Sequence, residues 1–465
     1  MQKTNLARNT IMLSVGTMLT KGINLLMIPL FSAWLSTEDY GTFDLLATYV
    51  SLLIPFVSLS SSDAIFRFAI EKDTDSERKP IVSSGLLINV INTVIVVIAL
   101  LIIRQTTHWV MAVPFVFLFI SELLNNHLQG FARATKQLTA YSFSSVISTI
   151  GIAVFVTVFV LFRKLGLLGM VYGYACGYYL GCFFLILSTK YLSFIDLRSI
   201  KISIIKKMVG YALPLVPNNI SWWIIGVSDR TFINIFLGAA ANGIYAIAYK
   251  IPNLCASVFN VFSISWQETA VELVDSDTRD TYYNQVYNST ISIIISLCGG
   301  LLAINFFLFN YIFNFRYIEG MLYSPILISS AIFSSLSQYF GGIQISLKKT
   351  TENGLTTVSG AITNIVIDLA LIKYIGLYAA AISTIVANFT VCYLRYVRLR
   401  REISFSISKK TIAHIIYYIY MFGMCYINNV YVAAMNFVFA TIMFLIINNA
   451  FVKKINKKLC SVIRR

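Results

Sequence analysis

Four basic residues inside long apolar runs are the side chains whose chemistry is easiest to state. They are Lys21, Arg67, Arg230 and Lys250. A charged group at the centre of an apolar helix costs about 2.5–3.5 kcal/mol on insertion scales, so it is expected to face a partner or a wet cavity. We therefore expect these cations to line a cavity that binds an anionic headgroup. For Arg230 and Lys250, a structural ion pair with Asp229 is the alternative.

Carboxylates form a second group within the same runs. The candidates for ion coupling or ion pairing are Glu122, Asp229, Asp63 and Glu268. Glu122 lies deep in its run and suits proton or sodium coupling, although an ion pair, for example with Lys21, fits equally well. Asp63 and Glu268, like Arg67, lie near the ends of runs, where simple solvation is slightly favoured over a gate. Asp44 lies three residues into a run and is expected at the membrane interface.

Amide and aromatic side chains accompany these charges and are candidates for lining the cavity. They are Asn24, Asn218, Asn219, Trp222 and Trp223. Pro29 and Pro217 lie beside them, and a proline frees backbone groups that protein or water must satisfy. The prolines predict bends in helices that border a wet space. The two tryptophans are compatible with stacking on sugar rings or with anchoring a helix at its depth.

No pattern in the sequence predicts an enzyme, a metal site or a bound cofactor. The three histidines, His108, His127 and His414, are far apart, and no Cys or His spacing matches a metal site. No Gly-Lys-Thr phosphate-binding loop is present. The seven cysteines are scattered through apolar runs, which argues against a secreted disulfide scaffold.

The elements that must position these residues are membrane-spanning helices. Of the 465 residues, 57% are hydrophobic and 12% are charged, and the mean hydropathy is +0.75. Apolar runs long enough to span a bilayer predict an all-α polytopic membrane protein with fourteen transmembrane helices, or twelve if the last two, which share a short break at Asn428-Asn429, are not separate spans. The expected spans are 10–34, 41–70, 81–103, 110–130, 141–162, 166–188, 210–237, 243–270, 284–309, 321–347, 354–372, 376–396, 411–427 and 431–450.

The distribution of charge orients these spans. The net charge of +16 is compatible with nucleic-acid binding only if the basic residues cluster on one surface. With the N-terminus inside, most of the 36 Lys and Arg residues fall in cytoplasmic segments. The opposite loops contain only Arg104, Arg163, Lys164, Arg316 and Lys373. This excess follows the positive-inside rule, so we expect a multi-pass protein with both termini in the cytoplasm and no nucleic-acid partner.

Two short motifs recur along the chain and predict two related halves. Leu35-Ser36 followed by Gly41-Thr42-Phe43 recurs as Leu237-Gly238 followed by Gly243-Ile244-Tyr245, and the stretch 165–169 recurs as 375–379. Each half contains six spans, so the halves are expected to be parallel repeats with a substrate site between them. The expected domains are a six-helix bundle (1–188), a basic cytoplasmic linker (189–209), a second six-helix bundle (210–396) and two extra helices with a basic tail (397–465).

Several of these motifs, taken in order, resemble one transporter family. They are Asn24–Leu30, Leu35-Ser36, Asp39–Gly41, Ser228–Arg230, Leu237-Gly238, Gly243–Tyr245, Asn364–Asp368 and Tyr374–Ala381. Their order and spacing over residues 10–400 are similar to those of the oligosaccharide (O-antigen and capsular polysaccharide) flippases. That family belongs to the multidrug/oligosaccharidyl-lipid/polysaccharide exporter superfamily.

The resemblance implies a fold and a function. It implies two six-helix bundles forming a V, a cationic central cavity and alternating access. It further implies transfer of undecaprenyl-pyrophosphate-linked oligosaccharides across the bacterial inner membrane for lipopolysaccharide or capsule synthesis, in contact with membrane lipids and with polysaccharide polymerase and chain-length proteins. The two spans after residue 411 depart from the commoner twelve-span pattern and are similar to those of peptidoglycan-precursor flippases. The alternatives are such a lipid flippase, a cation-coupled multidrug exporter and, from another class, a membrane glycan polymerase.

Overall fold

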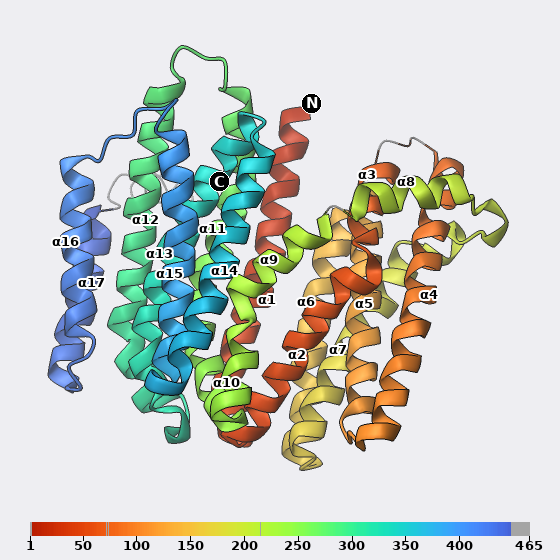
Figure 1. Ribbon diagram of the computed structural model, residues 1–465, viewed down its shortest axis with the longest axis horizontal. Helices are drawn as coiled ribbons and strands as arrows, with labels where there is room; N and C mark the ends of the chain where they lie inside the picture. The colour runs from red at the N-terminus through yellow and green to blue at the C-terminus, as the bar shows by residue number, and fades with distance from the viewer. Residues whose placement is uncertain (1, 71, 73, 214, 448–465) are drawn as a thin grey trace, which may run out of the picture. The chain divides into compact units, whose positions relative to one another are not determined.

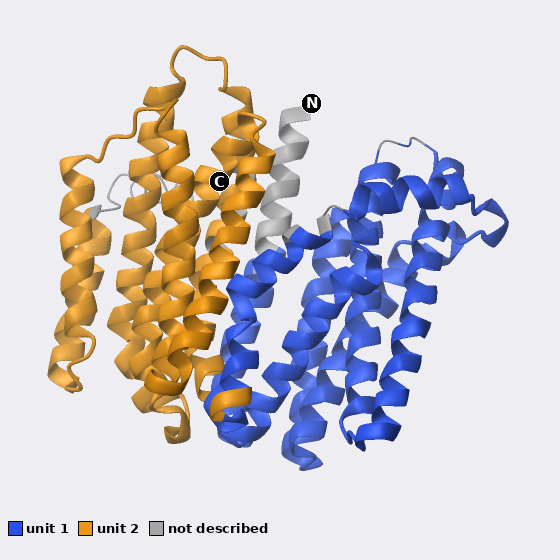
Figure 2. Cartoon of the chain, in the orientation of Figure 1, with its two compact units in different colours: residues 1–234, 238–243 blue, residues 235–237, 244–465 orange. Residues whose placement is uncertain are grey.

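A computed structural model describes residues 2–70, 72, 74–213 and 215–447 (Figure 1). The described residues form helices, turns and loops, and no strand occurs among them. The chain divides into two compact units, which are coloured separately in Figure 2. Unit 1 comprises residues 1–234 and 238–243, and unit 2 comprises residues 235–237 and 244–465. The division of the chain into functional domains that the sequence suggests stays a prediction.

Unit 1 is a helical bundle in which one helix crosses the end of the others. Helix α8 lies across that end, against α3 and α4 (Figure 1). The elements are α1 (Gln2–Trp34), α2 (Thr37–Ser58), α3 (Ser61–Ala69), α4 (Asp75–Thr107), α5 (Ala112–Ala134), α6 (Leu138–Val156) with the π-helical η1 (Thr157–Phe162), α7 (Gly166–Ser188), the 3₁₀ turns η2 (Tyr191–Phe194) and η3 (Leu197–Ser199), α8 (Ile202–Ala212), α9 (Leu215–Val227) and α10 (Asp229–Leu237), whose last three residues belong to unit 2.

Unit 2 is a second bundle with two further helices beside it. Its elements are α11 (Ala239–Glu272), which begins in unit 1, α12 (Arg279–Phe307) with the π-helical η4 (Leu308–Ile312), the 3₁₀ turn η5 (Phe315–Tyr317), α13 (Gly320–Ser346), α14 (Thr350–Ile375), α15 (Leu377–Leu399), α16 (Lys409–Met424) and α17 (Val430–Ile447). The segment before α16 is held by two amides of α12: Asn284 donates to the Ser404 carbonyl (2.5 Å) and Asn288 to that of Ser406 (2.9 Å).

Within the described residues the predicted spans fall on helices, which confirms the all-α membrane fold, while residues 448–450 of the last predicted span and the tail to residue 465 lie outside the described residues. In the part of the chain that the structure describes, eight helices are long and apolar enough to cross a membrane: α2, α4, α6 with η1, α7, α12 with η4, α13, α14 and α15. Met18–Trp34 and Val430–Ile446 are shorter apolar helical stretches. The number of helices that cross the membrane stays a prediction.

Two predicted spans are broken rather than continuous. The expected span 41–70 ends as α2 at Ser58 and resumes as α3 at Ser61, because Leu59 and Ser60 both adopt left-handed backbone angles (φ 46° and 52°). The expected span 210–237 falls on the end of α8 and on α9 and α10. The break at Leu59 and Ser60 interrupts the regular helical hydrogen bonds and leaves polar groups that need other partners.

Glycines on α7 allow this helix to pack closely on α6. Gly169, Gly173, Gly177 and Gly181 repeat every four residues and so share one face. A side-chain carbon on Gly177 would lie 2.5 Å from the Ile152 backbone nitrogen, and one on Gly181 would lie 1.8 Å from the Ser148 hydroxyl oxygen. The stripe is therefore a packing surface, as such small-residue patterns predict in membrane helices.

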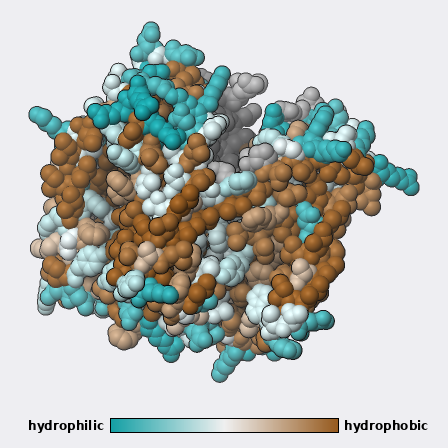
Figure 3. Space-filling view, viewed as in Figure 1, coloured by the Kyte–Doolittle hydropathy of each residue, from teal (hydrophilic) through white to brown (hydrophobic). Residues whose placement is uncertain are grey.

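Apolar side chains cover the outer flanks of the helices within each unit, and polar side chains gather at helix ends and loops (Figure 3). The exposed flank of α4 carries Val90, Ile91, Val94, Ile95, Ile98, Leu101, Ile102 and Ile103. That of α17 carries Met435, Phe437, Val438, Ile442 and Leu445. Exposed aliphatic flanks of this extent suit contact with lipid rather than water.

Candidate functional site

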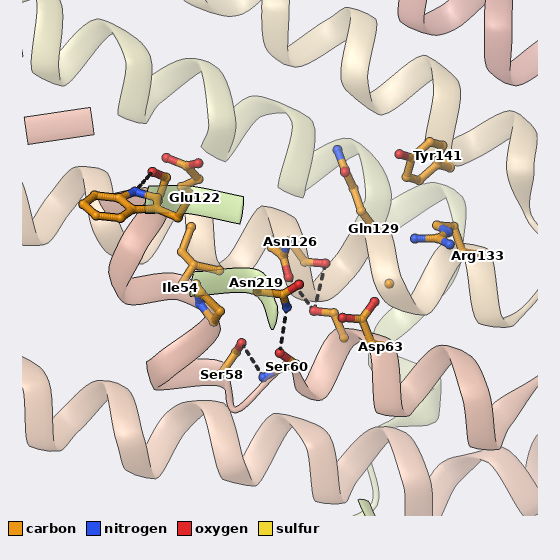
Figure 4. A pocket seen from close by; sticks show the side chains of 15 residues that line it. Ile54, Ser58, Ser60, Asp63, Glu122, Asn126, Gln129, Arg133, Tyr141 and Asn219 are labelled. Atoms are coloured by element: carbon orange, nitrogen blue, oxygen red, sulfur yellow. Dashed lines mark hydrogen bonds between the residues drawn. The ribbon is translucent and has the colours of Figure 1, made fainter. Parts of the chain in front are cut away.

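A polar pocket lies inside unit 1 and is the candidate site (Figure 4). Its volume is about 420 Å³, within the range of small-molecule sites. Five helices contribute to it, together with the break between α2 and α3. We call it the unit-1 pocket, and its lining residues are Ser51, Ile54, Pro55 and Ser58 of α2, Ser60 of the break, Ser62 and Asp63 of α3, Glu122, Asn126, Gln129, Gly130 and Arg133 of α5, Tyr141 of α6, and Asn219 and Trp223 of α9.

The break between α2 and α3 brings hydroxyl and carboxyl groups to this pocket. Pro55 is in the last turn of α2, and the Ser60 amide donates to the Pro55 carbonyl (3.3 Å) and to the Ser58 hydroxyl (3.1 Å). The left-handed conformation of Leu59 and Ser60 is uncommon for residues other than glycine. Such conformations cluster at functional sites, where the surrounding structure holds them in place.

Helix α5 supplies a polar stripe to the same pocket. Glu122, Asn126, Gln129 and Arg133 are spaced by four, three and four residues and so lie on one helix face. Asn126 accepts a hydrogen bond from the Ser62 hydroxyl at its amide oxygen (2.5 Å). Gln129 donates to the Ser145 hydroxyl (3.3 Å), and the Arg133 guanidinium lies 4.6 Å from the ring centre of Phe66.

Helix α9 closes the pocket with an amide and an indole. The Asn219 amide donates to the Ser60 hydroxyl (3.3 Å). The indole nitrogen of Trp223 donates to the Thr48 carbonyl and to the Ser51 hydroxyl, both at 3.1 Å. These bonds to α2 hold the tryptophan ring in one orientation at the edge of the cavity. The lining therefore combines two carboxylates, one guanidinium, three amides, several hydroxyls and two aromatic rings.

A buried hydrogen-bond chain supports the α3 side of the pocket. The Ser61 hydroxyl donates to the Asn89 amide oxygen (2.9 Å), so the amide nitrogen of Asn89 faces His127 Nδ1 (2.8 Å). His127 Nε2 contacts the Tyr191 hydroxyl (2.7 Å). Because an amide nitrogen only donates, His127 must accept at Nδ1 and donate at Nε2. Burial raises the pKa of the Tyr191 hydroxyl, which keeps it protonated. This series of hydrogen bonds joins α3, α4, α5 and η2.

The structure brings four of the sequence-predicted residues together in one pocket. Glu122, Asp63, Asn219 and Trp223 line the unit-1 pocket. The side chains of Lys21, Asn24 and Arg67 are exposed on α1 and α3, Trp222 is half-buried on α9, and Lys250 is half-buried in unit 2. The side chains of Asn218 and Glu268 lie outside what the structure describes. As described, the pocket lining includes none of the four predicted cavity cations.

Arg230 is held in a buried ion pair with Asp44. The guanidinium Nε lies 2.5 Å from the carboxylate, and the two side chains are 4% and 9% exposed. Asp44 is thus buried within unit 1, where it neutralises a cation that lies 186 residues away in the sequence, and its depth in the membrane stays a prediction. Asp229, next to Arg230, is also buried.

The two recurring motifs of the sequence contact each other close to this ion pair. Asn242 donates to the Gly41 carbonyl (2.7 Å). A side-chain carbon on Gly41 would lie 1.8 Å from the Ala239 carbonyl oxygen, and one on Gly243 would lie 2.0 Å from that of Thr37. Glycine is therefore required at both positions, because the two backbones touch there.

A second buried cation, Arg395, was missed by sequence reasoning, which grouped it with the cytoplasmic basic residues. Its side chain lies between α13, α14 and α15 and is among the most buried of its size. Its Nε donates to the Thr356 hydroxyl (3.1 Å), Nη1 to the Ser337 carbonyl (2.7 Å), and Nη2 to the Thr357 hydroxyl (2.9 Å) and the Asn353 carbonyl (3.3 Å). The Asn353 side chain also accepts from Nη2. This arginine ties three helices of unit 2 together.

Comparison with solved structures shows the fold. The structure described as lipid II flippase MurJ, inward closed conformation, is 14% identical, with a TM-score of 0.70 over 96% of this chain and 99% of that chain. An outward-facing multidrug resistance MATE family transporter of the MOP superfamily is 15% identical (TM-score 0.60; 85% of this chain, 95% of that chain). A MOP superfamily transporter from Pyrococcus furiosus, described as having a binding pocket of reverse polarity, is 16% identical (TM-score 0.59; 85% and 95%).

Comparison of sequences shows the family. No curated protein matches the chain. Residues 6–266, more than half of the 465, match the family described as polysaccharide biosynthesis protein. The structural neighbours are a flippase and transporters of the MOP superfamily, in agreement with the sequence motifs. The chain therefore belongs to the polysaccharide biosynthesis protein family.

Proposed function

We infer that this protein is a flippase that moves undecaprenyl-pyrophosphate-linked oligosaccharide units from the cytoplasmic to the periplasmic leaflet for surface polysaccharide synthesis. The observation that carries this proposal is the unit-1 pocket, a largely polar cavity inside a bundle whose outer flanks are apolar. Polar lining is costly within a membrane unless it serves a polar ligand or a water path. Membership in a polysaccharide biosynthesis family supports a glycan as that ligand.

We assign the pyrophosphate of the cargo to the predicted cations Lys21, Arg67, Arg230 and Lys250. Hydrogen bonds from Lys and Arg to phosphate oxygens are short and strong because both groups are charged. Lys21 and Arg67 have exposed side chains that a headgroup can reach. Arg230 must either exchange Asp44 for phosphate during transport or act by holding α10 in place.

We assign ion coupling to the carboxylates, with Glu122 as the first candidate because it lines the pocket. Asp63 lines the same pocket and is the second candidate. Asp229 and Glu268 remain coupling or ion-pair groups. A carboxylate that binds a proton or a sodium ion changes its charge, so it can link ion flow to a change of conformation.

The proposed setting is the bacterial cytoplasmic (inner) membrane, with both termini in the cytoplasm and transport by alternating access. The excess of basic residues in the segments assigned to the cytoplasm supports this orientation. The proposed bundles are residues 1–188 and 210–396, joined by the linker 189–209 and followed by two extra helices. Polymerase and chain-length proteins are the proposed partners, because they would use the exported glycan.

A second candidate function is a cation-coupled multidrug exporter, and one observation favours it. The unit-1 pocket contains two carboxylates, Asp63 and Glu122, against the single cation Arg133. Acidic pockets with aromatic walls suit cationic drugs. Higher drug tolerance on overexpression of the protein, with unchanged glycan export, would select this function over ours.

The leaflet distribution of lipid-linked glycan tests the proposal. In a strain that lacks the protein, we expect lipid-linked oligosaccharide to accumulate and to stay inaccessible to a glycan-modifying enzyme added outside the cytoplasmic membrane. Re-expression should restore access. Normal access in the deletion strain would refute the flippase function. Accumulation of a lipid-linked peptidoglycan precursor instead would reassign the cargo.

A further inference from the structure

We propose that the unit-1 pocket binds an uncharged sugar of the lipid-linked cargo and excludes its pyrophosphate. This inference rests on the proposed flippase function. It adds that the sugar and the pyrophosphate of the cargo are bound at two separate places. The sugar enters the pocket of α2, α3, α5, α6 and α9, while the pyrophosphate is held by cations outside that pocket.

The hydrogen-bonding groups of the pocket match sugar hydroxyls. Asn126, Gln129 and Asn219 carry amides, each with donors and an acceptor, and a serine hydroxyl can act as either. A sugar hydroxyl also donates and accepts. In the structure these groups bond to neighbouring side chains, for example Ser62 to Asn126 and Asn219 to Ser60. A bound sugar can replace such neutral bonds at small net cost, because each broken bond is exchanged for a new one.

The charge of the pocket separates sugar from pyrophosphate. Asp63 and Glu122 oppose one cation, Arg133, which also stacks over the ring of Phe66. A carboxyl group can bond to a sugar hydroxyl in either protonation state, and whenever it is ionised it also repels a phosphate. Pyrophosphate would require several Lys or Arg donors, and the described lining holds one arginine and no lysine.

Different side chains at the two ends of the pocket would orient a bound sugar. In Figure 4, Glu122 lies at one end of the lining, Tyr141 and Arg133 lie at the other, and Asn126, Gln129 and Asn219 lie between them. Trp223 adds an indole whose nitrogen is already bonded to Thr48 and Ser51, so its ring keeps one orientation. A fixed aromatic ring offers an apolar face to the C–H surface of a sugar ring. The volume of about 420 Å³ suits a short glycan segment rather than a whole lipid-linked chain.

Binding of neutral sugars to the purified full chain tests this inference. The probes are the methyl glycosides of glucose, galactose, mannose, N-acetylglucosamine and N-acetylgalactosamine. Calorimetry and protein fluorescence measure their binding. We expect at least one to bind, and expect Asn126→Leu and Gln129→Leu each to weaken it tenfold or more. Gln105→Leu is the matched control, because Gln105 is an exposed amide at the end of α4 outside the pocket. Inorganic pyrophosphate should not compete with the sugar.

Three outcomes would overturn the inference: no probe binds, both pocket variants bind as tightly as the control, or pyrophosphate displaces the sugar. Two variants are used so that a folding defect in one leaves the other informative, with thermal unfolding as the check on each. The leaflet assay in the deletion strain stands apart from this measurement. Normal leaflet transfer in the deletion strain refutes the flippase function, whereas impaired transfer with unchanged sugar binding in the variants refutes the sugar site alone.

Discussion

Each unit of the protein contains a group of charged and polar side chains within its helical bundle, but the two groups are built differently. In unit 1, Glu122, Asp63 and Arg133 surround a cavity of about 420 Å³. In unit 2, Arg395 is packed tightly, and hydroxyl, amide and carbonyl groups of α13 and α14 accept from its guanidinium. Both groups combine charged, amide and hydroxyl side chains, yet one surrounds an open space and the other fills it.

This difference shows how to separate binding residues from structural residues among charges inside a membrane protein. A buried cation whose donors are satisfied by neighbouring helices stabilises the packing, because its removal takes a charged donor away from several buried acceptors. Polar groups around a cavity have less to lose when one is replaced, and their chemistry is available to a ligand. The predictions below test this contrast, from the largest expected effect to the smallest.

Replacing Arg395 should cause the largest effect, and the effect should be on stability. Arg395→Met removes the guanidinium that donates to the Ser337 and Asn353 carbonyls and to the Thr356 and Thr357 hydroxyls, which should cost about 4 kcal/mol or more. The thermal unfolding midpoint in detergent and the protein yield measure it, with the exposed Arg400→Met as control. An unchanged midpoint combined with a selective loss of transport would contradict the structural role assigned to Arg395.

Replacing Arg230 should come next, because it removes the cation of a buried ion pair with Asp44. Arg230→Gln is expected to cost about 3 kcal/mol of stability. The double variant Asp44→Asn/Arg230→Gln removes both charges and should recover most of this loss. If Arg230 also contacts pyrophosphate, glycan transfer stays impaired in the double variant despite its recovered stability. Full recovery of transfer would place Arg230 with Arg395, as a structural residue.

Replacing Glu122 should reduce transport with little effect on folding. Glu122→Gln keeps the shape and removes the charge, so we expect transfer to fall at least tenfold, or about 1.4 kcal/mol, while the unfolding midpoint stays near that of the wild type. Glycan transfer per molecule of protein is the measurement. A shift of the midpoint as large as that of Arg395→Met would contradict the assignment of Glu122 to the pocket chemistry.

Replacing Lys21 should have the smallest effect. Its side chain is exposed, and exposed charge contacts contribute about 1 kcal/mol or less. Lys21→Ala should therefore lower transfer a few-fold and raise the half-saturating concentration of cargo, while Lys206→Ala, an exposed lysine on α8, should not. Equal behaviour of the two variants would remove Lys21 from the proposed pyrophosphate contacts.

Local sequence patterns predicted much of the fold. Within the described residues, runs of apolar residues located helices at the expected spans, and the four-residue glycine repeat of α7 lies on the face that packs closely against α6. Breaks were harder to predict. Leu59 and Ser60 carry no glycine or proline signal at the break itself, and Pro55, four residues earlier, is the nearest one. The backbone there depends on hydrogen bonds that only the folded chain provides.

The site was predicted in part, for a similar reason. Glu122, Asp63, Asn219 and Trp223 were selected one by one as polar or aromatic residues in apolar runs, and the structure places them around one cavity. The remaining amides of α5 could have been found, because their helical spacing with Glu122 forms a polar stripe in the sequence. Pairings between residues far apart in the sequence could not be predicted, since nothing near Asp44 in the sequence indicates that its partner is Arg230, 186 residues later.

Transfer of glycan in a reconstituted system tests the central claim most directly. The purified full chain is placed in vesicles with lipid-linked oligosaccharide extracted from the deletion strain, under a proton or sodium gradient, and an added glycosidase reports the glycan in the outer leaflet. We predict that wild-type vesicles continue to expose glycan after the first digestion, while protein-free and Glu122→Gln vesicles stop at that point. Identical digestion in all three would contradict the assignment of this protein as a flippase that works through the unit-1 pocket.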